Sequence, residues 1–292
     1  MKQLSPSGHK NPSKWKSLAC WGMFSLSFAL LYHHTLGDLA QDWWTNPDDS
    51  YGLVVPFAAV WILYSRYSSF KSTKVAPMAL GGMIWVTMSQ VMFLAGCLGA
   101  ESFLQEISIP LLAVGVILCL WGFAHLRLAM DVLGLFCICI PLPAIIMHQI
   151  TMPLQLIASA GSEAVLLALD IPVYRDGNIL HLARQTLSVA DACSGIHSLM
   201  ALFALAVIMS AVFGMGRTVR IMFVTSAVGV AIFANVLRIS MVAVIGSEIN
   251  PRFTVGMWHQ AEGWVVFTVS LLILGLELHF IDRMSVKRGK TV

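Results

Sequence analysis

Three polar side chains stand at or near the ends of long apolar runs, and their types suit thiol chemistry. They are Cys193 in the segment DACSG, Arg238 in NVLRI, and His259 in WHQAEG. A charged or nucleophilic side chain is expensive inside a membrane and marks a functional site by default. A thiol, a guanidinium and an imidazole are also the groups that thiol-based acyl transfer needs.

The composition indicates a polytopic membrane protein. Of the 292 residues, 58% are hydrophobic and only 11% are charged, and the mean hydropathy is +0.78, whereas a soluble domain carries about 25% charged residues. The apolar surplus is therefore expected to face the lipid bilayer. The net charge of +3 is small, and no basic stretch interleaved with aromatic residues indicates a nucleic-acid partner.

The cysteines predict neither a disulfide framework nor a metal site. Five of the six lie inside apolar runs, where a free cysteine behaves as a small hydrophobe. The pair Cys137 and Cys139 does not have a metal-ligand spacing, and no second Cys/His pair accompanies it. We therefore expect no metal and no cofactor. Cys193 differs because polar residues and a glycine surround it.

About eight apolar runs are candidates for crossing a bilayer core of ~30 Å, for which a helix needs about 20 residues. The candidate spans are Leu18–Leu36, Leu53–Tyr67, Pro77–Leu98, Ile107–His125, Leu128–Met147, Cys193–Phe213, Ile221–Gly246 and His259–Phe280. The predicted fold class is thus all-α, a polytopic membrane helix bundle. We expect one integral membrane domain over residues 1–292.

One further segment, Gln149–Leu169, decides the topology. If it does not cross, nearly all lysines and arginines outside the spans fall on one side. If it does cross, Arg217, Arg220 and the basic C-terminal tail move to the other side. Because positive charge collects on the cytoplasmic side, we interpret this segment as an interfacial or re-entrant helix on the outer face. The protein is then expected to be a multi-pass protein of the cell inner membrane with both termini in the cytoplasm.

This topology brings the three polar residues to one side. Cys193 opens the sixth span at its outer end, where the positive end of the helix dipole favours a thiolate. Arg238 follows Ile221 by 17 residues, about 25 Å along the seventh span. His259 opens the eighth span, again at the outer end, and Gly263 leaves room beside its imidazole. The active site is therefore predicted on the extracytoplasmic face.

Several local patterns predict smaller features. Asp176-Gly177-Asn178 is a turn signal, and the segments 179–182 and 186–189 could pair as a short hairpin around it. Asp131 is placed to pair with Arg127 at helical i,i+4 spacing. The pair Trp43-Trp44 fits an aromatic belt at the membrane interface.

With these residues on one side, the chain resembles the exosortase/archaeosortase family of multi-span membrane cysteine enzymes. The resemblance is carried by the segments ACSG at Cys193, NVLRI at Arg238, and His259 followed by Gly263 and Phe267. The segments PLP at 141–143 and IPV at 171–173 support it. It covers residues from about 50 to 280, and the catalytic region is about 171–280.

The resemblance implies that Cys193 is the nucleophile and that Arg238 and His259 complete the site. Asn235, Ser194 and Gly195 are candidate substrate-binding residues. The implied reaction is cleavage of C-terminal sorting signals (PEP-CTERM-like) of exported proteins through a thioester. Each such partner ends in a short motif, a membrane helix and a basic tail. The chain departs from the family at Tyr51, where a histidine usually stands.

Two other function classes fit parts of the pattern. A membrane transporter would use the arginine and histidine to line a substrate path, but the sequence has no inverted repeat and no charged trail through the membrane. A non-catalytic assembly or chaperone protein would not need the cysteine. A reactive Cys193 on the outer face distinguishes the enzyme from both.

Overall fold

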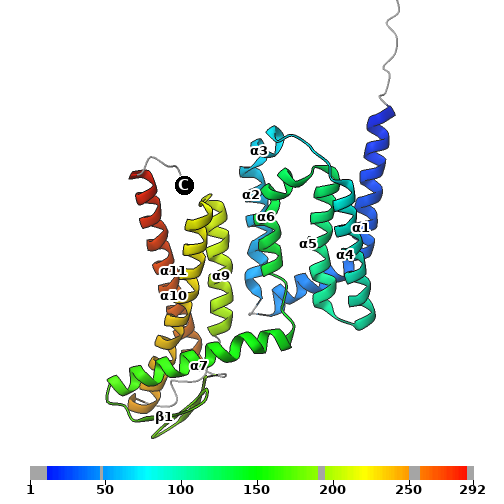
Figure 1. Ribbon diagram of the computed structural model, residues 1–292. Coiled ribbons are helices and arrows are strands. Elements are labelled where there is room, and N and C mark those ends of the chain that lie inside the picture. The colour runs from blue at the N-terminus through cyan, green and yellow to red at the C-terminus, as the bar shows by residue number, and fades with distance from the viewer. Residues whose placement is uncertain (1–11, 47–48, 190–194, 250–256, 288–292) are drawn as a thin grey trace, which may run out of the picture.

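The computed structural model describes residues 12–46, 49–189, 195–249 and 257–287, and it is mainly helical (Figure 1). This agrees with the predicted all-α fold. The helices are α1 (Pro12–Thr45), η1 (Ser50–Val54), α2 (Val55–Ser65), α3 (Tyr67–Ser72), α4 (Ala79–Gly99), α5 (Ser102–Leu120), α6 (Phe123–Ile138), α7 (Ala144–Ala168), α9 (Gly195–Val212), α10 (Arg217–Val244), the π-helix η2 (Ile245–Ile249) and α11 (Met257–Lys287). A small sheet contains β1 (Val173–Asp176), β2 (Ile179–Leu182) and β3 (Thr186–Ser188).

Most long helices run in roughly the same direction, and α7 lies across their lower ends (Figure 1). In the described part of the chain, five helices are long and apolar enough to cross a membrane. They are Ala79–Gly99, Ser102–Leu120, Ala144–Ala168, Arg217–Ser247 and Gly263–Ile281. By length and composition alone α7 is one of them, yet it runs across the others. The number of eight spans therefore stays a prediction.

The two ends of the bundle differ in charge. The upper end in Figure 1, which we call the basic end, carries α3, the start of α6, the start of α10 and the end of α11. Its described basic residues are Arg66, Lys71, Lys74, Arg127, Arg217, Arg220 and Arg283. The lower end, which we call the α7 end, carries α7 and the sheet.

The chain turns sharply between α6 and α7 because prolines stand there. Pro141 and Pro143 have no backbone N–H and cannot continue the helix, so the last carbonyl groups of α6 need other donors. Trp43 Nε1 donates to the Cys139 carbonyl at 2.9 Å, and the Tyr51 hydroxyl donates to the Ile138 carbonyl at 3.2 Å. Trp43 is therefore buried rather than part of an interface belt, whereas its neighbour Trp44 is 79% exposed.

The helix boundary between α5 and α6 lies five residues earlier than predicted, at Gly122. This residue has a φ of +86°, and a Cβ there would lie 1.8 Å from the Ala76 carbonyl oxygen. Only glycine adopts this conformation with so close a neighbour. The runs expected as Ile107–His125 and Leu128–Met147 are accordingly α5, α6 and the first residues of α7.

The predicted hairpin is confirmed and belongs to a three-stranded sheet. Strand β2 pairs with β3, with Leu180 opposite Leu187. The sequence predicts the turn at 176–178 within this hairpin, but the turn instead joins β2 to the additional strand β1, with Gly177 at a φ of +60°. An isolated hairpin is marginally stable in water, so the sheet needs a surface to pack on.

Helix α7 provides that surface through polar contacts and an apolar cluster. Arg175 Nε donates to Glu163 at 2.7 Å, and Asn178 Nδ2 donates to Gln155 at 2.9 Å. The Ser159 hydroxyl donates to the Gly177 carbonyl at 2.9 Å. Buried apolar side chains from α7, the sheet and α10 form one cluster behind these contacts: Ala158, Leu166, Ile171, Leu180, Val189, Ile239 and Ala243.

The loop between β2 and β3 covers the end of α10. Arg184 Nη1 donates to the Ser247 carbonyl at 3.0 Å, and Gln185 Nε2 donates to the Ala243 carbonyl at 3.4 Å. A Cβ at Gly246 would lie 2.1 Å from the Gln185 amide. A cation at the last carbonyl groups of a helix also complements the helix dipole. The sheet thus fixes α10 where its polar residues lie.

At the basic end, a single carboxylate joins three helices. Asp131 of α6 accepts a hydrogen bond from Arg66, which follows α2, and another from Arg220 in the first turns of α10. Arg66 also donates to the Leu128 carbonyl at 2.9 Å. The predicted pairing of Asp131 with Arg127 is wrong, because arginines from two other helices occupy both carboxylate oxygens. Arg127 instead lies over the Phe123 ring, 5.1 Å from its centroid.

Replacing Asp131 should destabilise the whole bundle. Asp131→Asn leaves two arginines facing each other without a counter-charge, which we expect to cost about 1–3 kcal/mol, reduced from the cost at a fully buried site by partial exposure. The thermal unfolding midpoint of the detergent-solubilised protein measures the effect. Arg127→Ala is the control and should shift the midpoint much less. Equal shifts for the two variants would contradict this assignment.

Removing the contact between Arg184 and the end of α10 should lower the local stability of residues 243–247. Arg184→Ala loses a charge-assisted hydrogen bond, so we expect the opening free energy of residues 243–247 to fall by about 1 kcal/mol, or about fivefold in exchange rate. Hydrogen–deuterium exchange measures this directly. Arg175→Ala, on the side of the sheet facing α7, should leave exchange at 243–247 unchanged. Unaltered exchange in Arg184→Ala would show that the contact does not stabilise α10.

Candidate active site

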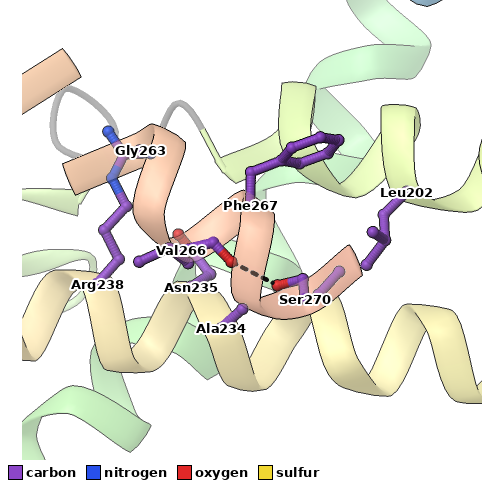
Figure 2. A pocket seen from close by; sticks show the side chains of 9 residues that line it. Leu202, Ala234, Asn235, Arg238, Gly263, Val266, Phe267 and Ser270 are labelled. Carbon is purple, nitrogen blue, oxygen red and sulfur yellow. Dashed lines mark hydrogen bonds between the residues drawn. The ribbon is translucent and has the colours of Figure 1, made fainter. Parts of the chain in front are cut away.

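Arg238 lies in the last third of α10 and is only 5% exposed. Asn235 stands one helical turn earlier and shares its face. Both line a crevice between α9, α10 and α11 (Figure 2). The other lining residues are Leu202, Ala231, Ala234, Gly263, Val266, Phe267 and Ser270. The open space is about 10 Å³, which is about the room that one water needs.

Helix α11 meets the arginine at Gly263. Figure 2 shows the Arg238 side chain extending from α10 toward this glycine. A Cβ at Gly263 would lie 3.9 Å from Arg238 Cζ and 4.0 Å from Nη2, which is ordinary van der Waals contact. His259 precedes Gly263 by one turn of α11 and so stands on the same helix face. Its backbone belongs to α11, but its side chain lies outside the described residues.

Helix α9 reaches the same crevice through Leu202. The helix begins at Gly195, seven positions earlier, and positions seven apart share a helix face. The start of α9 therefore lies on the side that faces the crevice. Cys193 and Ser194 precede this start and lie outside the described residues. The structure thus brings Arg238, Asn235 and Gly263 together, and it places the helix starts at 195 and 257 at the same end of the bundle (Figure 1).

Helix α7 crosses α10 between its two polar residues. The Ser162 hydroxyl lies 3.3 Å from the Val236 carbonyl oxygen and donates to it. A Cβ at Gly161 would come within 2.9 Å of the Val236 side chain, so the two helices approach closely. Ser240 donates to the same carbonyl at 2.8 Å. This crossing fixes the part of α10 that carries Asn235 and Arg238.

The sequence reading missed most of the apolar lining. On α10 the positions 231, 234, 235 and 238 share one face, and on α11 the positions 263, 266, 267 and 270 do the same. Helical periodicity was therefore the signal that could have found them. The Ser270 hydroxyl donates to the Val266 carbonyl of the same helix at 2.9 Å (Figure 2).

The chemistry available in the crevice is that of a cation and an amide. A guanidinium offers five N–H donors and no acceptor, and it stays charged. Enclosure by apolar side chains excludes water, which strengthens its attraction for an oxyanion. Among the described residues, no group of three or more His, Cys, Asp or Glu could hold a metal ion.

The chain is similar to a known protein family over most of its length. Residues 43–276 match the family described as transmembrane exosortase, and this stretch includes the crevice and all three candidate catalytic positions. No curated protein and no solved structure matches the chain. The family match covers well over half of the sequence, and the chain therefore belongs to the transmembrane exosortase family.

Proposed function

We propose that the protein is a cysteine-dependent membrane protease or transpeptidase that cleaves C-terminal sorting signals of exported proteins. Membership of the exosortase family indicates in general a membrane enzyme that processes sorting signals. The observation that carries the finer proposal is the enclosed Arg238 in the crevice between α9, α10 and α11. Helices α9 and α11 begin at the same end of the bundle, with Cys193 just before one and His259 in the first turn of the other.

The proposed reaction begins with attack of the Cys193 thiolate on the scissile carbonyl carbon. The carbonyl oxygen becomes an oxyanion, and Arg238 stabilises it by donating N–H groups. The C–N bond then breaks, and His259 gives its proton to the leaving amine. The product is a thioester between Cys193 and the exported protein. Asn235 is well placed to hold a backbone group of the substrate beside Arg238.

The second half-reaction releases the exported protein. A water molecule or an acceptor amine attacks the thioester carbonyl while His259 accepts its proton. Arg238 stabilises the second oxyanion, and the thiolate of Cys193 leaves. Ser194 has a small side chain and Gly195 has none, which would let the substrate backbone approach the thiol closely.

The proposed orientation places this site on the extracytoplasmic face of the inner membrane. Its support is that Arg238 lies in the last third of α10 and Gly263 near the start of α11, both toward the α7 end, whereas most of the described basic residues lie at the opposite end. Positive charge favours the cytoplasmic side, so both chain termini would be cytoplasmic. The transverse course of α7 (Figure 1) supports an interfacial position for this helix. The proposed eight crossings are then α1, α2, α4, α5, α6, α9, α10 and α11.

Removing the thiol tests the mechanism. We expect Cys193→Ala to lower processing by at least about 10³-fold, because the proposed thioester forms on the Cys193 thiol. The assay is co-expression with an exported protein that ends in a short polar motif, an apolar helix and an arginine-rich tail, followed by gel mobility. Cys97→Ala removes an exposed free thiol and is the control. A Cys193→Ala variant that still processed its substrate would refute the proposal.

Labelling of Cys193 from outside the cell separates the enzyme from a transporter or an assembly protein. A membrane-impermeant maleimide should react with the native protein and lose most of its signal in Cys193→Ala. Equal labelling of the native protein and of Cys193→Ala would show that Cys193 is not a reactive thiol on the outer face.

The arginine should be irreplaceable by lysine. Arg238→Lys keeps the charge but loses the planar fork of donors, so we expect kcat to fall by about 10²-fold to 10³-fold while the protein still binds substrate. Single-turnover cleavage together with substrate co-purification measures both quantities. Native cleavage rates in Arg238→Lys would remove Arg238 from the mechanism.

A further inference from the structure

A carboxylate that the proposed mechanism does not use lies in α11, near the basic end. Glu277 belongs to the apolar segment Gly263–Ile281 and stands one turn before its end. Its side chain is half-buried. A charged side chain inside an apolar membrane segment is costly and normally faces a partner.

The partner that Glu277 has within the described residues does not satisfy it. The Ser226 hydroxyl lies 2.8 Å from Oε1 and 2.7 Å from Oε2. The same hydroxyl lies 2.7 Å from the Phe223 carbonyl oxygen. A hydroxyl has one hydrogen, so it can serve one of these three acceptors at a time. The carboxylate keeps most of its capacity to accept hydrogen bonds.

Among the described residues, Arg220 is already bonded to another carboxylate, and no basic residue stands one helical turn from Glu277 in α11. Arg220 of α10 donates to Asp131 on α6. Within α11, the positions three and four residues away from Glu277 are Ile273, Leu274, Phe280 and Ile281, and none of them is basic. These positions of the described chain therefore offer Glu277 no counter-charge, and a basic group of a bound molecule could supply one.

The surface around Glu277 suits an apolar helix. Leu276, Phe280 and, across on α10, Met222 are 59%, 62% and 67% exposed. Helix α11 is the least buried of the five long apolar helices. We propose that Glu277 forms an ion pair with a lysine or arginine at the inner end of the substrate's membrane helix, which lies along α10 and α11. This inference rests on the proposed function, because it takes the substrate to be the partner.

The distance to the crevice fits such a helix. Glu277 follows Gly263, which faces Arg238, by 14 positions, or about 21 Å along α11. A partner helix whose outer end reaches the crevice would present its inner end at about this level. The long side chain of a lysine or arginine reaches back along the helix by about one further turn.

A binding measurement that needs no cleavage tests the proposal. The probe is a labelled peptide with about 20 leucines and alanines that ends in a run of arginines, compared with the same peptide ending in glutamines. Full-length protein and peptide share nanodiscs of uncharged phosphatidylcholine, and energy transfer reports binding. We expect the arginine peptide to bind about tenfold more tightly. Equal binding of both peptides to the unaltered protein would overturn the proposal.

Two variants assign that preference to Glu277. Glu277→Gln keeps the contact with Ser226 and should make the two peptides bind about equally. Glu277→Lys should prefer a peptide that ends in glutamates, which rules out simple misfolding. Glu101→Gln, at the α7 end, is the control and should keep the native preference. A native preference in Glu277→Gln, or no reversal in Glu277→Lys, would overturn the assignment.

The same measurement in Cys193→Ala separates the two proposals. Because binding does not need the thiol, this variant should keep the preference for arginine. A protein that prefers the arginine peptide but never cleaves a sorting signal would refute the proposed function alone. A protein that cleaves without regard to Glu277 would refute this inference alone.

Discussion

At the basic end, ion pairs at Asp131 join the N-terminal helices to the helices that form the crevice. Asp131 of α6 binds Arg66 from the end of α2 and Arg220 from α10, and so connects the N-terminal helices with the helices that form the crevice. Because the three side chains are largely buried, removing one of them leaves an uncompensated charge. Buried apolar residues of α2, α6 and α9 continue this connection toward the α7 end.

At the α7 end, side-chain hydrogen bonds to backbone carbonyl groups of α10 and η2 hold the site in place. Helix α7 rests on the Val236 carbonyl group, and the loop of the small sheet covers the last carbonyl groups of α10. These contacts fix α10 from two directions within about two turns of Arg238. A guanidinium that must meet an oxyanion needs such support, because electrostatic stabilisation depends on a fixed position.

The sequence predicted what depends on local periodicity and on charge. The depth of Arg238 and the position of Gly263 on the same side follow from helix rise and apolar runs, and the structure brings the two together. The β2–β3 pairing follows from alternation and turn residues. Each of these predictions needs only a short stretch of chain.

Contacts between distant segments could not be read in this way. Asp131 has a suitable neighbour at i,i+4, yet its partners lie 65 and 89 positions away. Trp43 looks like an interface residue until the carbonyl group of Cys139 is placed beside it. The break at Gly122 depends on the carbonyl of Ala76. Partners of this kind are set by how helices pack, and apolar periodicity does not specify them.

The narrowness of the crevice has a kinetic consequence. A space of about 10 Å³ has room for a solvent molecule but not for a peptide group. In the proposed reaction, a substrate carbonyl would therefore reach Arg238 only after one wall of the crevice has moved. Helix α11 is the least buried of the five long apolar helices, so its displacement would disturb the least packing. Turnover would then include a gating step within the bilayer, and the thickness and fluidity of the lipid would influence the rate of that step.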